Sequence, residues 1–383
     1  MSTIELREGR TMAVDDGVGG TASRGGRGAG WLRRAMLGCA AFIALAPAGA
    51  AEPGGKGAQV PSETLAEFAR PHQLVDIGGR KLNLFCMGAG PRTVLFDAGG
   101  SDWSVIWALV LPEVAKHARA CAYDRAGLGY SDPAAGPRSP IAIVEDLHAL
   151  IRAAGIETPL VLVGHSLGGF HTKLYARLYP EDVAGLVLID PAEERSSERV
   201  RALLLKRYGA SLTARLELRD NDGLGLLLAR FERCVAAAKD GDLDPQSPLY
   251  RRCSDPVRPA LGPAIAAERA RIQVTRSYQE IQGSEVINSV YGKAAGDPIY
   301  AALFRPGVFG NKPLIVLTHG RFDADDPFDV ADFQSGLWLH EQTAALSRRG
   351  RHRVVPDTSH NIEIDDPAAV IDAVVEVLGS SSR

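Results

Sequence analysis

The stretch LVLVGHSLGG, residues 160–169, organises the rest of the chain. Its apolar start runs directly into a G-x-S-x-G motif, and a segment able to form a helix, residues 170–177, follows at once. Strand, sharp turn and helix are the setting in which this motif forms a nucleophile elbow, with the Ser166 hydroxyl exposed at the top of a sheet. Glycine is needed at 164 and 168 because a Cβ there would collide with neighbouring backbone. The alternative is a tight strand-to-helix turn with an incidental serine.

Short apolar strands alternate with helices on both sides of this stretch. The pattern predicts a hairpin over 72–87, strands over 93–98, 119–124, 183–189, 313–318 and 351–355, and helices over 107–117, 140–154, 333–346 and 367–378. Such alternation is typical of a parallel sheet covered by helices on both faces. Between residues 192 and 311 the pattern is helical and charged, which indicates an insertion rather than a second sheet domain.

Composition limits the classes of partner. The chain has 383 residues, of which 45% are hydrophobic, so a large core is available. The formal net charge is −3 and no basic stripe occurs, which argues against nucleic acid as the main partner. The sequence shows no cluster of metal ligands and no phosphate-binding loop, so we expect neither a metal nor an organic cofactor.

The N-terminal region is predicted to be an export signal. Arg33 and Arg34 precede an apolar run over 35–46, and small residues follow up to Ala51. A basic segment, a short apolar run and a small-x-small site are typical of a secretory signal. We therefore interpret residues 1–51 as a signal peptide with a polar extension, followed by a linker over 52–71, and expect an exported protein, periplasmic or secreted.

Three alternatives to this interpretation remain open. They are a twin-arginine signal, a lipoprotein signal at Cys39, and an uncleaved membrane anchor. The apolar run is short for a bilayer span, so we expect no stable membrane span in the mature protein.

Cysteine usage is compatible with export. Without Cys39 the chain keeps Cys86, Cys121, Cys234 and Cys253, an even number. The first two fall on predicted strands that could be neighbours, and the last two lie in one helical region. An oxidising compartment would permit two bridges, and the alternative is four buried thiols.

A serine hydroxyl needs an adjacent base to act as a nucleophile at neutral pH. His360 is the candidate base for Ser166, because it is the only histidine beyond the last predicted strand. His165 adjoins Ser166, but neighbouring side chains on such a turn diverge. The alternative for His360 is a loop-capping role.

The carboxylate that orients the base has several candidates. Asp323 follows the strand over 313–318 and is the first choice, with Asp325 and Asp326 close by. Asp190 ends the strand over 183–189 and could reach the same imidazole from the next loop. Each of these aspartates could instead cap a helix or a loop.

Two backbone N–H groups are candidates for an oxyanion hole. Leu167 opens the helix after Ser166, and its N–H points to where a negative charge would develop. Gly100 follows the strand over 93–98, where a glycine lets the backbone approach that charge closely. The alternative for Gly100 is a plain strand-to-helix turn.

The sequence YDRAGLGYSD, residues 123–132, together with GHSLGG at 164–169, resembles the α/β-hydrolase-1 group of the α/β-hydrolase superfamily. The resemblance implies a mostly parallel sheet of about eight strands, with a core of residues 72–191 and 312–383 and a helical cap over 192–311. The chain departs from the family at Ala98, where members often carry histidine.

The resemblance implies a serine hydrolase that cleaves a small-molecule ester, in the manner of an esterase or lipase, through an acyl-enzyme on Ser166. Thioesterase action is an alternative. An aminopeptidase is another, and it would use Glu268, Glu280 or Glu285 to hold an α-amino group. A non-catalytic binding protein of the same fold also remains open. The sequence carries no signal for an oligomeric state.

Overall fold

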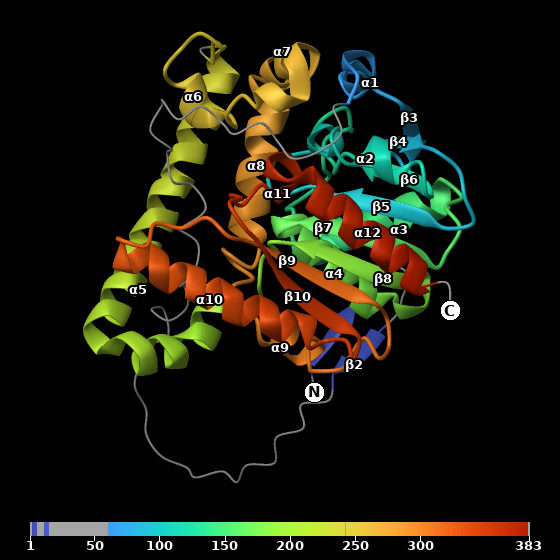
Figure 1. Ribbon diagram of the computed structural model, residues 1–383. Coiled ribbons are helices and arrows are strands. Elements are labelled where there is room, and N and C mark those ends of the chain that lie inside the picture. The colour runs from blue at the N-terminus through green and yellow to red at the C-terminus, as the bar shows by residue number, and fades with distance from the viewer. Residues whose placement is uncertain (1, 6–10, 15–59, 242, 382–383) are drawn as a thin grey trace.

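The computed structural model describes residues 2–5, 11–14, 60–241 and 243–381 (Figure 1). The apolar run and cleavage site of the predicted signal lie outside the described residues, as does Cys39, so the signal peptide stays a prediction. Strands β1 (Ser2–Glu5) and β2 (Thr11–Val14) form a small antiparallel sheet of their own. No helix within the described ranges has the length and hydropathy needed to cross a membrane.

An eight-stranded sheet forms the centre of the molecule, in the order β10-β9-β8-β7-β5-β6-β4-β3. Its strands are β3 (Gln73–Asp76), β4 (Lys81–Met87), β5 (Thr93–Asp97), β6 (Arg119–Tyr123), β7 (Leu160–His165), β8 (Val183–Ile189), β9 (Leu314–His319) and β10 (Gly350–Val355). Only the β3–β4 and β4–β6 pairs are antiparallel. The predicted fold class is therefore confirmed.

Both faces of the central strands β5, β7, β8 and β9 are buried, which explains why these strands read as continuous apolar runs. Side chains alternate between the faces: Leu160 and Leu162 of β7 belong to one core, and Val161 and Val163 belong to the other. The helices that cover the sheet, together with short helical turns, are η2 (Ser104–Trp107), α2 (Leu111–Val114), α3 (Pro140–Ala153), α4 (Ser166–Leu178), η3 (Pro180–Asp182), α10 (Pro327–Ala344), α11 (Ile362–Asp365) and α12 (Pro367–Ser381). Leucines of α3 and α4 contribute to the first core, and valines of α2 and α12 contribute to the second.

The segment between β8 and β9 is helical and stands beside the sheet in Figure 1. It contains α5 (Ser196–Asp240), α6 (Tyr250–Cys253), η4 (Pro259–Leu261), α7 (Gly262–Gln273), α8 (Arg276–Asn288) and α9 (Pro298–Leu303). We call this segment the cap. Its long helix α5 is interrupted at Gly209, whose φ of 77° and ψ of 171° lie outside the helical region.

Two disulfide bonds are present, and they join the pairs considered from the sequence. Cys86 and Cys121 lie opposite each other on the neighbouring strands β4 and β6. Cys234 of α5 is bonded to Cys253 of α6 within the cap. One bond thus cross-links the sheet, and the other closes a loop of the cap.

The stretch expected to be a polar linker contains a helix, α1 (Ser62–Glu67). Leu65 and Phe68 are buried, and the Phe68 ring lies edge-on to Phe85, with 4.6 Å between the ring centroids. Two apolar residues three positions apart share one helical face, and this short pattern anchors the segment to the core.

Two helix boundaries also differ from those predicted. Helix α10 begins at Pro327, six positions before the predicted start, because Asp326 caps it by accepting from the N–H of Phe328 at 2.9 Å. The expected helix over 107–117 is instead divided into the short turns η2 and α2.

Candidate active site

Ser166 stands at the junction of β7 and α4 with a φ of 50°, in the left-handed region. Two glycines make this turn possible. A Cβ on Gly164 would lie 2.4 Å from the carbonyl oxygen of Gly168, and a Cβ on Gly168 would lie 2.4 Å from that of Ala98. Such separations are far below van der Waals contact, so both positions require glycine. The turn has the strained geometry of a nucleophile elbow.

The two candidate oxyanion donors belong to segments in contact. Leu167 is the second residue of α4, and Gly100 lies in the loop after β5. A Cβ on Gly100 would come within 2.8 Å of the Leu167 side chain. Gly100 is therefore packed directly against the Leu167 side chain. The structure brings both predicted donors to the edge of the site where Ser166 lies.

His360 lies in the loop between β10 and α11. Its Nδ1 is 2.5 Å from Oδ2 of Asp190, which directly follows β8. Asp190 is almost fully buried, and its φ of 43° turns the chain out of the strand. Its backbone N–H donates to the carbonyl of Leu317 at 2.7 Å, which ties this turn to the neighbouring strand β9. This turn and its backbone bond thus fix the position of the Asp190 carboxylate next to the His360 imidazole.

Asp323, the first choice from the sequence, is not the carboxylate that contacts His360. It is exposed in the loop before α10, where its Oδ1 accepts from the N–H of Asp325 at 2.9 Å. Asp326 caps α10, as described above. The contact with His360 is made by Asp190, the alternative acid, which directly follows β8.

Asp190 also binds a second histidine, which the sequence analysis did not single out. Nδ1 of His319, the last residue of β9, lies 2.7 Å from the same Oδ2. Burial alone would raise the pKa of Asp190, but the hydrogen bonds from His319 and His360 hold that pKa well below its ordinary value. Asp190 is therefore ionised at neutral pH. A histidine ending the strand beside that of Asp190 was the signal available in the sequence.

Among the residues that the structure describes, Asp190, His319 and His360 form a group that could hold a metal ion, with possible ligand atoms within 4.8 Å of one another. The Nδ1 atoms of both histidines already face the aspartate as hydrogen-bond partners. A metal there would need Asp190 to give up both bonds. The arrangement fits an Asp–His pair better than a metal centre.

A family model of the alpha/beta hydrolase fold matches residues 92–367. The chain belongs to the α/β hydrolase family. A protein of Hormonema carpetanum called probable transporter efuK is 34% identical over 137 residues, 33% of this chain and 19% of that protein. Lipase LipV of Mycobacterium tuberculosis is 39% identical over 119 residues, 30% of this chain and 43% of the lipase.

These matches span less than two thirds of either relative. A thermophilic esterase from Thermogutta terrifontis has a similar fold, with a TM-score of 0.51 and 20% identity. The alignment covers 82% of this chain and 99% of the esterase. Among solved structures the likeness therefore concerns the α/β hydrolase fold as a whole.

In this α/β hydrolase a buried arginine supports the loop that carries Gly100. Arg125 donates from Nη1 to Asp97 at 2.7 Å and from Nη2 to the carbonyl of Gly99 at 2.7 Å. Its Nε donates to Oε1 of Glu285, on cap helix α8, at 2.7 Å. Arg125 lies within the YDRAGLGYSD stretch, and its side chain joins the loop that follows β5 to the cap. We call this loop, residues 98–103, the oxyanion loop after its candidate donor Gly100.

A second ionic contact joins the same loop to the cap. Arg269 of α7 donates to Asp102 at 2.8 Å and to Asp255 at 2.9 Å, and its guanidinium lies over the Trp103 ring. Buried Lys173 of α4 lies 2.8 Å from Glu193, in the segment that follows Asp190. These ion pairs connect the loop after β5 to the cap, and the segment after Asp190 to α4.

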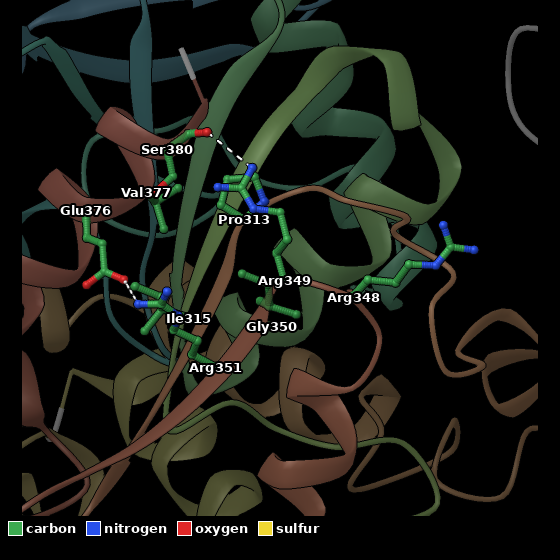
Figure 2. A pocket seen from close by; sticks show the side chains of 10 residues that line it. Pro313, Ile315, Arg348, Arg349, Gly350, Arg351, Glu376, Val377 and Ser380 are labelled. Carbon is green, nitrogen blue, oxygen red and sulfur yellow. Dashed lines mark hydrogen bonds and ion pairs between the residues drawn. The ribbon is translucent and has the colours of Figure 1, made fainter. Parts of the chain in front are cut away.

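The hollow in Figure 2 lies at the opposite edge of the sheet. Its lining includes Pro313 and Gly350, which lie at the starts of β9 and β10. Two of its arginines are already bound, Arg351 to Glu376 at 2.7 Å and Arg349 to the carbonyl of Ser380 at 3.3 Å. Asp190 and His360 lie beyond the C-terminal ends of the parallel strands β8 and β10, whereas this hollow lies where β9 and β10 begin. The hollow is therefore separate from the candidate active site.

Proposed function

We propose that this α/β hydrolase is a serine esterase that cleaves a small-molecule carboxylic ester through an acyl-enzyme on Ser166. The observation that carries the proposal is the bond between buried, ionised Asp190 and Nδ1 of His360, in a chain whose elbow holds Ser166 at positive φ. Membership of the family supports hydrolase activity in general, and the Asp190–His360 bond together with the Ser166 turn supports the acyl-enzyme route.

The mechanism uses His360 as a proton shuttle. Because Nδ1 donates to Asp190, the lone pair of the neutral ring lies on Nε2, which takes the proton of Ser166 as its Oγ attacks the ester carbonyl. Burial lowers the pKa of His360, and the bond to Asp190 opposes this shift, so the imidazole is neutral and able to act as a base near neutral pH. Asp190 then stabilises the imidazolium that forms.

The remaining steps complete the cycle. The N–H groups of Leu167 and Gly100 bind the oxyanion of the tetrahedral intermediate. Its collapse breaks the ester C–O bond, and the alcohol leaves with the proton held by His360. Water then attacks the acyl-enzyme while His360 takes its proton, and the carboxylic acid is released with Ser166 regenerated.

The aminopeptidase alternative has little support. Glu285 is bound to Arg125, Glu268 accepts two hydrogen bonds from Arg271, and Glu280 accepts one from Arg276. Each of the three acids considered for binding an α-amino group is thus already paired with an arginine. A thioester would follow the same steps as an ester and is the second candidate.

Labelling with a fluorophosphonate probe tests the nucleophile. We expect the wild-type protein to gain one probe by intact mass, and Ser166→Ala and His360→Ala to gain none, since one removes the nucleophile and the other its base. Ser335→Ala is the matched control, because the Ser335 hydroxyl lies on α10 and donates to the carbonyl of Ala331. A folded wild-type protein that is not labelled would favour the non-catalytic binding protein instead.

A series of p-nitrophenyl esters of increasing chain length then tests the substrate class. Turnover that depends on Ser166 supports esterase action, and its chain-length profile measures the acyl pocket. Labelling without ester turnover, combined with cleavage of thioesters, would replace the esterase proposal with a thioesterase.

We also propose that the protein is exported, as a periplasmic or secreted enzyme. The signal pattern over 1–51 and the two disulfide bonds support this, because disulfides persist in oxidising compartments. We expect N-terminal sequencing of the protein recovered outside the cytoplasm to begin near Glu52. A full-length chain with five free thiols in the cytosolic fraction would contradict the proposal.

A further inference from the structure

Glu363 is a buried carboxyl group next to the triad that the proposed mechanism does not use. It lies on α11, three residues after His360, and its side chain is fully buried. Across the ranges that the structure describes, neither of its carboxyl oxygens has a hydrogen-bond partner. The Nδ1 atom of His165 lies 3.3 Å from Oε1 of Glu363. A buried carboxyl group without a partner is costly, so this contact calls for an explanation.

The hydrogen bonding of His165 determines what its Nδ1 requires. Nε2 of His165 lies 2.9 Å from the backbone carbonyl oxygen of His360. A carbonyl oxygen only accepts, so Nε2 carries the proton, and in the neutral ring Nδ1 presents a lone pair. A protonated carboxyl group complements that lone pair, whereas a carboxylate would be repelled by it. The terminal torsion of a glutamate is soft, so the carboxyl group is able to turn its O–H toward Nδ1.

His165 occupies a central place between the two halves of the site. Its ring centroid is 4.6 Å from that of His360, and a Cβ on Gly99 would lie 2.9 Å from its Nδ1. The ring is therefore packed between the oxyanion loop and the loop that carries the base. A change in its orientation would displace the backbone of His360.

The surroundings favour the neutral form of both groups. Burial lowers the pKa of His165 to about 4 and raises the pKa of Glu363 to about 8. The other charged groups that act on Glu363 are Arg258 of the cap and His360, which lower its pKa, and Asp102 of the oxyanion loop, which raises it. Between about pH 4 and pH 8, a neutral acid thus faces a neutral imidazole.

We propose that Glu363 is a positioning residue for the catalytic base: its protonated carboxyl group donates to Nδ1 of His165, and His165 in turn holds the backbone carbonyl of His360. The inference rests on the proposed function, because its main readout is the activity of the Ser166 site. When Glu363 ionises, its carboxylate faces the lone pair of His165, the contact is lost, and His360 is no longer held for proton transfer.

The pH dependence of kcat tests this role through the conservative variant Glu363→Gln. We expect wild-type kcat to fall about tenfold per pH unit well above pH 8. In Glu363→Gln the amide N–H₂ donates at every pH, so the alkaline decline should disappear while most of the kcat at pH 7 remains. Glu363→Ala lacks a donor and should lose kcat at all pH values, with a smaller change in KM.

The control is Glu376→Gln on α12, whose carboxyl group binds Arg351 at the far edge of the sheet and should leave the alkaline limb unchanged. The infrared C=O stretch of a protonated carboxylic acid should be present in wild type at pH 7 and absent in Glu363→Gln. Circular dichroism verifies that each variant folds.

Two results would overturn the inference. One is a wild-type alkaline limb retained in Glu363→Gln, and the other is a folded Glu363→Gln that is as inactive at pH 7 as Glu363→Ala. Failure of the proposed function itself is distinguishable, because the wild-type protein would then show no fluorophosphonate labelling at pH 7.

Discussion

Asp190→Asn is expected to lower kcat by about 10⁴-fold, whereas Asp323→Asn should change it by less than about twofold. In the wild-type protein Nδ1 of His360 donates to the buried carboxylate, which leaves Nε2 as the acceptor for the serine proton. An asparagine amide presents an N–H to Nδ1 instead, so the ring takes the tautomer with a proton on Nε2. That tautomer cannot act as the base for Ser166.

Steady-state kinetics on the preferred p-nitrophenyl ester checks this prediction, with circular dichroism to verify the fold of both variants. Asp323 is the matched control, because it is a carboxylate of the same type on the loop that follows β9, but it is exposed and bonded within that loop. A large loss of kcat in Asp323→Asn, with activity retained in Asp190→Asn, would show that the acid in solution is Asp323.

Arg125→Leu is expected to lower the free energy of unfolding by about 3–5 kcal/mol. Arg125 is buried and lies 2.7 Å from both Asp97 and Glu285. Removing it leaves two buried carboxylates uncompensated and deprives the carbonyls of Ala98 and Gly99 of their donor. The oxyanion loop and the cap helix α8 then lose a common anchor, so kcat should fall together with stability.

Chemical denaturation of the wild-type and variant proteins measures this loss. In the double variant Arg125→Leu with Glu285→Gln, part of the stability should return, because one uncompensated charge is neutralised. Arg271→Leu removes an arginine from an exposed pair with Glu268 and should cost less than about 1 kcal/mol. Equal costs for the two arginines would mean that the buried network contributes no more than a surface ion pair.

The parts of the site that follow from local sequence were predictable. Glycines at 164 and 168 allow the turn that holds Ser166 at positive φ, and a turn of this kind is specified by a few neighbouring residues. His360 was identified by its place beyond the last strand. The start of α10 at Pro327 also had a local signal, because an Asp-Pro pair is typical of a helix N-terminus, but this signal was not used in the prediction.

The partners of these residues depended on contacts between distant segments. Asp190 and Asp323 both follow strands that end at the same edge of the sheet, so their place in the chain does not separate them. The tight turn at Asp190 and its backbone bond to Leu317 direct its carboxylate to His360, while the loop after β9 carries Asp323 into solvent. Only the packed loops distinguish the two.

The sequence by itself determined the eight-stranded α/β hydrolase sheet, the elbow at Ser166 and the position of His360, because apolar periodicity and glycine requirements act over a few neighbouring residues. The tertiary structure alone decided the acid, the approach of Glu363 to His165 and the pairing of Arg125 with Glu285, 160 residues apart. The residues next to a charged side chain in the sequence do not indicate which group it will contact. That partner is decided only when folding brings distant loops together and excludes water from between them.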